Sequence, residues 1–462
     1  MRRTVCYLLA VSSWLCLCNA HAAVRPRYGG TLHVQVESPL TSLDPKQSDS
    51  NQADAIARQR ILPLIFETLV TADFQGRAHP SLAIAWQADL SFRRWQFYLR
   101  PGVRFQDGAV LSAAAVSQSL ASSHPEWTTH VEGDTLVIES ETPQPGLLAE
   151  LALLRNAIVR RGTSGEWLGT GPFRIANWQT GKALELAAND SCWSGRPFLD
   201  SVQIDLARSS RDQVLAFQLG KADLIELEAD QLSRAGESRS AHVSLPRELL
   251  ALVAGPTSKS EEAAVREALS LAVDRKAMQS ALLRGGSDPA ASPLPAWISG
   301  DAFLFSTQMD TARARQLLAG TKRTSPLTLS YDNGDALTRL IAERIALNAR
   351  EVGLQVQAVP VSGTSNSDLR LVRILLRSSD PAVALREIAA ETGLNPQLNG
   401  SNVDEVYASE KRLLAGSSII PLFHLPIASI TGDHVRNWPQ DKLGSWPLAE
   451  VSLDRAGDPQ RP

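Results

Sequence analysis

Short amphipathic strands and helices alternate along this chain, and this succession limits it to an α/β or α+β architecture. Alternating apolar positions predict strands over Thr31–Val36, Trp95–Leu99, Val202–Leu206 and Leu354–Val359. Helical spacing of apolar residues predicts helices that begin near Ser112, Asp310 and Asp335, and one long helix over Glu261–Leu283. We therefore expect a mixed fold in which strands and helices pack in layers.

The chain length predicts more than one lobe. With 462 residues the protein exceeds what a single hydrophobic core holds, so two or three lobes are expected. The formal net charge is −3, and no basic block interleaved with aromatic residues is present. A nucleic acid is therefore not expected as a partner.

The first 22 residues have the three parts of a secretory signal peptide. Arg2 and Arg3 are followed by a mostly apolar run, Val5–Cys18, and then by Ala20-His21-Ala22. The alternative is an N-terminal membrane anchor, but the run is shorter than the ~20 residues that span a bilayer. We expect cleavage near Ala22 and a periplasmic location.

The cysteines follow from this cleavage. Cys6, Cys16 and Cys18 leave with the leader, and no small residue of the kind expected before a lipid-modified cysteine precedes Cys16 or Cys18. Cys192 then remains alone, so the mature chain forms no intrachain disulfide. A packed, unreactive thiol is the favoured interpretation, and a nucleophile is the alternative.

Catalytic and metal-binding motifs are not found. The eight histidines are scattered, and the sequence has no HExxH, CxxC or Walker loop. Gly169-Thr170-Gly171 resembles the start of a dinucleotide loop, but Phe173–Trp178 after it has the pattern of a strand. We expect no enzyme activity, no cofactor and no metal.

Several segments, taken in order, resemble the family 5 bacterial extracellular solute-binding proteins, the oligopeptide-, dipeptide- and nickel-binding components of ABC importers. The segments that carry the resemblance are Gly29-Gly30-Thr31-Leu32, Ser42-Leu43-Asp44-Pro45, Ile65–Val70, Pro80-Ser81-Leu82-Ala83, Trp95–Val103 with Phe105-Gln106-Asp107-Gly108, Gly169–Phe173, Trp193–Pro197, Val265–Ser270 with Ala272–Lys276, and Asp380-Pro381. Their order and spacing make a chance match unlikely.

The resemblance implies a class II periplasmic binding protein fold, with two large lobes, a small inserted lobe and a ligand cleft between lobes. The expected divisions are the signal peptide 1–22, lobe I from 23–59, 169–250 and 431–462, lobe II at 60–168 and lobe III at 251–430. It also implies a monomer that binds a small molecule or short peptide by hinge closure and delivers it to an ABC permease in the cytoplasmic membrane.

The chain departs from its peptide-binding relatives in lobe III. Relatives carry a Gly-Trp pair there, followed by an aspartate that pairs with the ammonium group of the ligand. The segment that starts at Asp368 reads DLRLVRILLRSSDP, with Arg373-Ile374 in place of the Gly-Trp pair and Arg377 in place of the aspartate. The candidate ligand-binding residues are Asp49, Asn51, Arg373, Leu375 and Arg377.

A guanidinium at position 377 favours an anionic ligand over the amino terminus of a peptide. The alternative is that Arg377 pairs with a neighbouring acid such as Asp368 or Asp380. A shortened lobe II and the two arginines also leave open a binding domain that no longer serves transport and acts as a sensor or docking partner.

Overall fold

The computed structural model describes residues 26–454, except 50, 122, 233–239, 256–261, 301–303, 305, 322–324, 363–365 and 399–401. The expected signal peptide lies outside the described residues. None of the helices in the described part of the chain has the length and hydropathy to cross a bilayer.

One mixed sheet runs through the molecule. Its strand order within the described residues is β10-β11-β12-β1-β13-β19-β14-β18-β16-β17, and β15 pairs with β19 off this path. The strands are β1 (Thr31–Gln35), β10 (Phe173–Gln179), β11 (Ala183–Ala188), β12 (Ser201–Asp205), β13 (Leu224–Leu227), β14 (Ala241–Ala254), β15 (Asp288–Pro289), β16 (Leu327–Asp332), β17 (Val356–Val361), β18 (Leu369–Leu375) and β19 (Ile419–Thr431).

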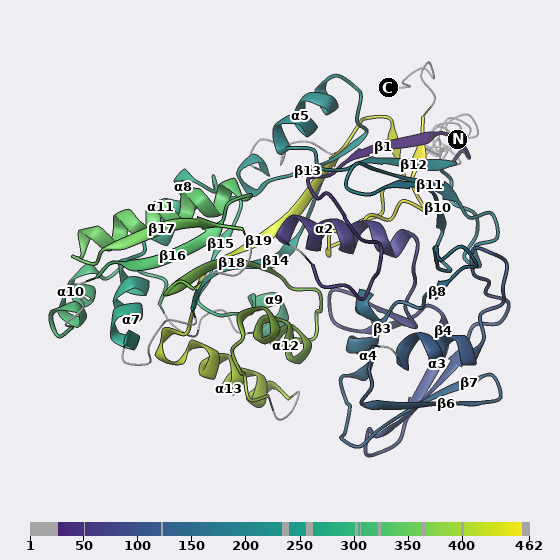
Figure 1. Ribbon diagram of the computed structural model, residues 1–462, viewed down its shortest axis with the longest axis horizontal. Helices are drawn as coiled ribbons and strands as arrows, with labels where there is room; N and C mark the ends of the chain where they lie inside the picture. The colour runs from purple at the N-terminus through teal and green to yellow at the C-terminus, as the bar shows by residue number, and fades with distance from the viewer. Residues whose placement is uncertain are drawn as a thin grey trace, which may run out of the picture.

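The N-terminal body is formed by β1, β10–β13, α2 (Gln52–Ile61) and α5 (Ser210–Gln218) (Figure 1). The inward-facing residues of its strands are fully buried, among them Leu32, Val34, Val202 and Ile204. These residues pack with α2 and with Trp446 near the end of the chain. The C-terminal segment therefore returns to the core in which the chain begins.

A separate four-stranded sheet lies beside the N-terminal body. Its order is β4 (Ala83–Ala88), β5 (Arg94–Leu99), β7 (Thr135–Ser140) and β6 (Trp127–Glu132), and α3 (Ala113–Ala121) packs on β6 and β7. Trp95 and Phe97 lie in its own core, together with α4 (Leu147–Leu151). We call this unit the small body.

The C-terminal body covers its part of the long sheet with helices on both faces. Residues Leu250 and Leu252 of β14 face one core, whereas Leu249 and Ala251 face the other. The first core holds α7 (Ala263–Ala272), α8 (Arg275–Ala281), α10 (Thr311–Ala319) and α11 (Ala336–Glu351). The second holds α9 (Ala296–Ser299), α12 (Pro381–Thr392) and α13 (Val403–Leu414).

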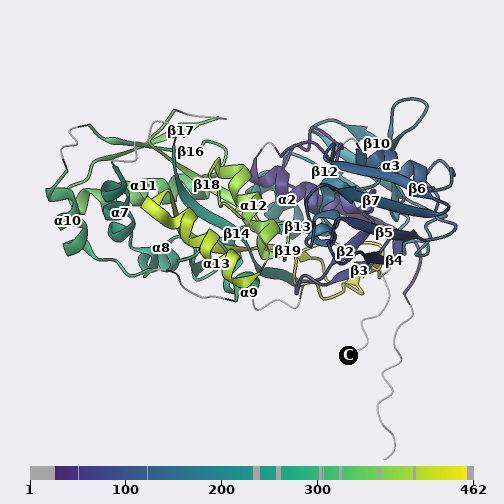
Figure 2. The same cartoon turned by 90° about the horizontal axis from the view of Figure 1, so that it is seen from below.

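Two long strands, β14 and β19, connect the N-terminal and C-terminal bodies, which lie at opposite ends of the long axis (Figures 1 and 2). Residues Ala428–Thr431 of β19 pair with β13 of the N-terminal body, and β14 pairs with β19 from Ile419 to Ile430. The β14–β19 register is irregular around Pro246 and Pro426, which lie opposite each other. Since proline donates no backbone hydrogen bond, the ladder loses hydrogen bonds at this crossing.

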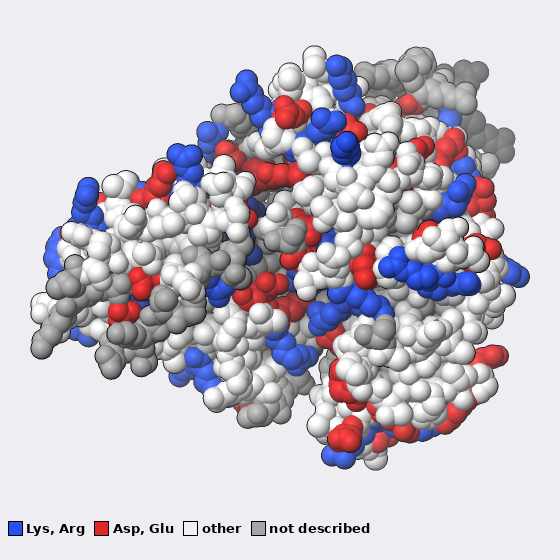
Figure 3. All heavy atoms as spheres, viewed as in Figure 1, with Lys and Arg blue, Asp and Glu red and all other residues white. Residues whose placement is uncertain are grey.

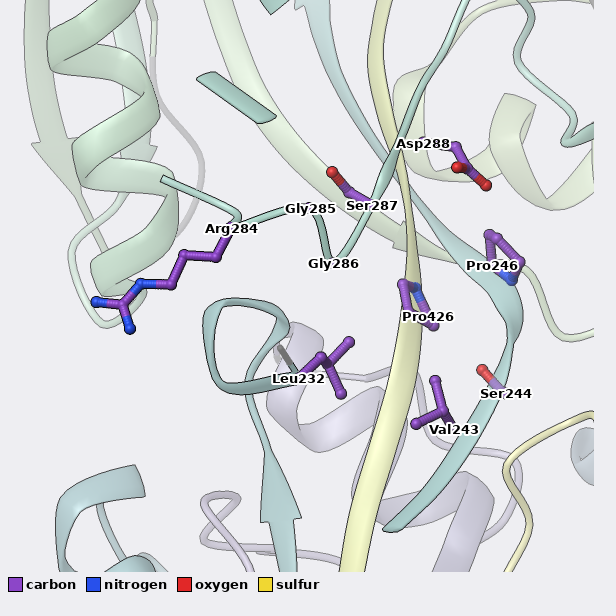
Figure 4. A pocket seen from close by; sticks show the side chains of 10 residues that line it. All are labelled: Leu232, Val243, Ser244, Pro246, Arg284, Gly285, Gly286, Ser287, Asp288 and Pro426. Atoms are coloured by element: carbon purple, nitrogen blue, oxygen red, sulfur yellow. The ribbon is translucent and has the colours of Figure 1, made fainter. Parts of the chain in front are cut away.

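A shallow pocket of about 370 Å³ lies beside this crossing (Figure 4). Pro246 and Pro426 form one side of it, and Gly285-Gly286 and Leu232 lie opposite. The pocket therefore lies beside the irregular part of the β14–β19 ladder.

The expected α/β binding-protein fold is confirmed, and most predicted elements occur within a few residues of their expected bounds. The helix expected over Glu261–Leu283 is an exception, because α7 and α8 are separate helices. Val273 is extended, and the Asp274 carboxylate accepts the Ala277 backbone N–H at 2.9 Å, which caps α8. The aspartate after an apolar helical run was the signal that helix periodicity missed.

Candidate ligand-binding site

A cavity of about 770 Å³ lies between the N-terminal and C-terminal bodies. The N-terminal body contributes Glu37, Asn51, Arg60, Glu226 and Glu228 among its lining residues, and the C-terminal body contributes Glu248, Asp332, Asp335, Leu340 and Arg373. Figure 3 shows acidic side chains gathered in the hollow between the two bodies. An interlobe cavity of this size can enclose a small molecule.

Neighbouring parallel strands bring the acidic residues of the N-terminal body together. β1 and β13 pair in parallel, with Val34 opposite Leu224 and Gln35 opposite Ile225. Their carboxyl ends therefore lie side by side, and the Glu37 backbone N–H donates to Glu226 Oε2 at 2.8 Å. In open α/β sheets, ligands bind beyond the carboxyl ends of such strands.

Arg60 on α2 forms part of the cavity wall, although its side chain is only 2% exposed. Its Nη1 lies 3.0 Å from Glu226 Oε1, and its Nη2 donates to the carbonyl oxygen of Ala428 at 3.0 Å. Burial lowers the pKa of Arg60, while the Glu226 carboxylate opposes that shift. Arg60 is therefore a structural cation that balances one of the cavity carboxylates.

Arg373 on β18 is surrounded by carboxylates. Its Nη2 lies 2.7 Å from Glu248 Oε2, its Nη1 lies 3.0 Å from Asp335 Oδ2, and Glu228 Oε2 is 4.0 Å away. Burial alone would lower the pKa of Arg373, but these carboxylates outweigh burial and hold the pKa above its usual value. The guanidinium is thus permanently charged and already paired.

Carboxylates outnumber guanidinium groups among the lining residues. The acidic residues are Glu37, Glu226, Glu228, Asp230, Glu248, Asp332 and Asp335, against Arg60, Arg211 and Arg373. Burial and the neighbouring carboxylates raise the pKa of Glu228 to about 7, against the attraction of Arg373, although about a third of its side chain (34%) is exposed. Burial, followed by Glu226, also raises the pKa of Glu37. The cavity therefore disfavours further negative charge.

Apolar side chains form another part of the wall. Leu337 and Leu340 come from the first turns of α11, Val214 from α5 and Ile56 from α2. Ile341 and Ile345 of the same helix are fully buried, whereas Leu340 is 48% exposed. Helix periodicity placed Leu340 at the edge of the apolar face, and the structure turns this edge toward the cavity.

The family model described as "Bacterial extracellular solute-binding proteins, family 5 Middle" matches residues 77–373, more than half of the chain. The chain belongs to this family. Within it, the chain is 25% identical to the nickel-binding protein NikA of Staphylococcus aureus over 318 residues, which is 63% of either chain and less than two thirds of the relative's length. It is 24% identical to the glutathione-binding protein GsiB of Pectobacterium atrosepticum, over 70% of this chain and 68% of that one.

A solved structure of S. aureus NikA in complex with Ni(L-His)2 superposes with a TM-score of 0.79. The superposition covers 92% of this chain and all of the other, at 19% sequence identity. This similarity confirms the fold of a family 5 protein. Within the described residues, no cluster of three or more His, Cys, Asp or Glu side chains is arranged to hold a metal ion.

Two of the five residues that the family resemblance singled out line the cavity, namely Asn51 and Arg373. Asn51 also caps α2, because its side chain accepts the Asp54 backbone N–H at 2.9 Å. Leu375 is 1% exposed and packs against Ala55 of α2 and Ile427 of β19. It joins the two bodies instead of facing the cavity.

Asp49 and Arg377, the remaining two, do not line the cavity and form an ion pair with each other. The backbone N–H of Arg377 also donates to Glu387 Oε2 at 3.0 Å. Asp368, one of the expected neighbours, accepts from Thr328, and Asp380 caps α12. Arg377 is thus paired with carboxylates, but these belong to Asp49 and Glu387 and not to Asp368 or Asp380.

The family motifs did not indicate Glu37, Glu226, Glu228, Glu248 or Asp335 as cavity residues. Asp335 was noted only as the start of a helix, which it caps through the backbone N–H groups of Leu337 and Thr338. The other four are single acids within or just after strands. They become a group only when the sheet places β1, β13 and β14 around one cavity.

Proposed function

We propose that this family 5 protein is the exported substrate-binding component of an ABC importer, and that it captures a small ligand with a cationic group in the cavity between its two bodies. The periplasmic location, the signal peptide 1–22, the three-lobe division and delivery to a permease are parts of this proposal. The excess of carboxylates over guanidinium groups in the cavity is the observation that carries the ligand class.

Charge complementarity supports a cation. Of the three lining arginines, Arg60 pairs with Glu226, and Arg373 pairs with Glu248 and Asp335. Glu37, Asp230 and Asp332 add further carboxylates to the lining of the cavity. An ammonium or guanidinium group of a ligand would neutralise these carboxylates through charge-assisted hydrogen bonds.

The anionic ligand inferred from Arg377 is not retained in this proposal. That inference required a guanidinium free to face the ligand. Arg377 instead faces Asp49 and Glu387, and its side chain is 18% exposed. Repulsion by the cavity carboxylates would also weaken the binding of an anion.

The apolar wall adds a second requirement. Leu337, Leu340 and Val214 also line the cavity. Covering them would remove apolar surface from water, at roughly 25 cal/mol for each Å² buried. We therefore propose a ligand with an apolar portion beside its cationic group, such as a short peptide with a free amino terminus.

A binding screen tests the ligand class. The probes are dipeptides that contain arginine or leucine, the same dipeptides N-acetylated, and dicarboxylates of similar mass, each titrated by calorimetry into ligand-stripped protein. We expect the free dipeptides to bind, and we expect Glu228→Gln to weaken them by roughly tenfold. Glu343→Gln on the outer face of α11 is the matched control, with no change expected. Tight binding of the dicarboxylates alone would refute a cationic ligand.

Delivery needs a separate test. A strain that lacks the ABC permease encoded nearest this gene should lose uptake of the radiolabelled ligand, and so should a strain that lacks the binding protein. If uptake persists in the second strain while binding is retained in vitro, the protein serves sensing or docking instead of import.

A further inference from the structure

A row of alternating charges passes through all three bodies of the protein. In spatial order it consists of Arg58, Asp49, Arg377, Glu387, Arg155 and Glu150. Arg58 and Asp49 belong to the N-terminal body, Arg377 and Glu387 to the C-terminal body, and Arg155 and Glu150 to the small body. The row crosses a boundary between bodies twice, at Asp49–Arg377 and at Glu387–Arg155.

The N-terminal end of the row is held rigidly. Arg58 Nε lies 3.1 Å from Asp49 Oδ1, and the Arg58 side chain is 3% exposed. The same guanidinium donates to the carbonyl oxygens of Ser42 at 2.9 Å and Gln47 at 3.1 Å. The loop between β1 and α2 is therefore fastened to α2, which leaves the second oxygen of Asp49 for Arg377.

The remaining charged side chains of the row are also held in place by neighbouring groups. Glu387 on α12 is 4% exposed, lies 4.0 Å from Arg377 Nη1 and accepts the Arg377 backbone N–H at 3.0 Å. Arg155 Nη1 approaches Glu387 Oε1 to 3.6 Å, and Arg155 binds Glu150 through two hydrogen bonds of 2.8 and 2.7 Å. Partly buried pairs of this kind are screened less than exposed ones.

The Asp49–Arg377 pair joins two bodies whose connecting strands pair irregularly. The two bodies are connected through β14 and β19, and the ladder between these strands is irregular at Pro246 and Pro426. Near the pair, Leu375 of β18 packs on Ala55 of α2, so apolar contact accompanies the ionic contact. Opening the cavity at the Pro246–Pro426 crossing would separate Asp49 from Arg377.

We propose that the Asp49–Arg377 pair is a latch that keeps the two bodies closed over the cavity when no ligand is bound. Arg58 and Glu387 hold the two halves of the latch in position. A ligand can shift the equilibrium only by its differential affinity for the open and closed forms. With the latch present, most of the ligand-free protein is already closed. The ligand must then enter through the minor open form.

Small-angle X-ray scattering of the mature protein, stripped of ligand by unfolding and refolding, tests this. We expect the wild-type radius of gyration to match the closed form and to change little with the dipeptide probe. Arg377→Gln and Asp49→Asn should raise the open-to-closed ratio by roughly tenfold and increase the radius of gyration. The double variant should open no further than either single one, because both remove the same contact.

Two controls separate the latch from general destabilisation. Arg339→Gln removes the Arg339–Glu343 pair, which lies within α11, and should leave the radius of gyration unchanged. If the variants do not fold, the wild type in about 1 M salt serves instead, because screening weakens the latch. A ligand-free wild type that is already open, or one whose closure is unaffected by salt and by both substitutions, overturns the proposal.

Discussion

Pro246 on β14 lies directly opposite Pro426 on β19, at the point where the two strands pass from one body to the other. A central strand position normally excludes proline, because its missing N–H interrupts the ladder. Two facing prolines combine this loss in one place. The β14–β19 ladder is therefore interrupted at this crossing, and both cavities border on Pro426.

The ionisation of Glu228 predicts a pH dependence of stability. The pKa of its carboxyl group is about 7 in the folded protein, compared with the ordinary glutamate value of 4.5. The folded state thus binds more protons than the unfolded state between these values, so this group's contribution to stability falls as the pH rises through that window. Thermal unfolding between about pH 5 and pH 8 should show a smaller loss of stability for Glu228→Gln than for the wild type. A steeper loss in the variant would contradict this.

Leu340 predicts a separation of binding from stability. Because its side chain is 48% exposed, Leu340→Ser should change the free energy of unfolding by less than about 0.5 kcal/mol. It should nevertheless weaken ligand binding, since Leu340 lines the cavity. Leu347→Ser on the same helix is the control, because Leu347 is similarly exposed but does not line the cavity. Equal binding by the two variants, measured by calorimetry, would exclude a role for the apolar wall.

Gly169 predicts a steric limit in the Gly-Thr-Gly segment. A Cβ at this position would lie 2.1 Å from the carbonyl oxygen of Ile65. Gly169→Ala should therefore lower the free energy of unfolding by about 1–3 kcal/mol, measured by urea denaturation. Gly320→Ala is the control, since the nearest atom would be 4.0 Å away. This glycine serves packing, in agreement with the strand that follows it.

We expect the thiol of Cys192 to be unreactive in the native state. It is 8% exposed and lies 3.2 Å from Ser194 Oγ, and burial raises its pKa. In protein that lacks residues 1–22, labelling by a disulfide reagent should be slow in the native state and fast in urea. Rapid native labelling would show that the segment around Cys192 opens readily.

Local signals were sufficient for most of the fold. Asp310 and Asp335 were recognised as helix starts, and each caps its helix in the structure. The alternation at Leu32 and Val34 likewise predicted β1, because one face of the strand is buried. Signals of this kind involve residues that are close in sequence, so they can be recognised without knowledge of distant contacts.

The site could be predicted only in part, because its residues meet through pairings distant in sequence. Glu37 and Glu226 are 189 positions apart and become neighbours through the parallel β1–β13 pairing. Arg377 was identified from a family motif, but its partner Asp49 is 328 positions away. No local sequence pattern reveals such a contact. The inference of an anionic ligand from Arg377 was therefore made without knowledge of its ion pair with Asp49.

The most direct test of the central claim is native mass spectrometry of the protein isolated from the cells that produce it, followed by identification of the small molecule that it releases. We predict one bound molecule with an ammonium or guanidinium group and an apolar portion, retained by the wild type and depleted in Glu228→Gln. A bound molecule that carries only carboxylate or phosphate groups, held equally by both proteins, would contradict capture of a cation in this cavity.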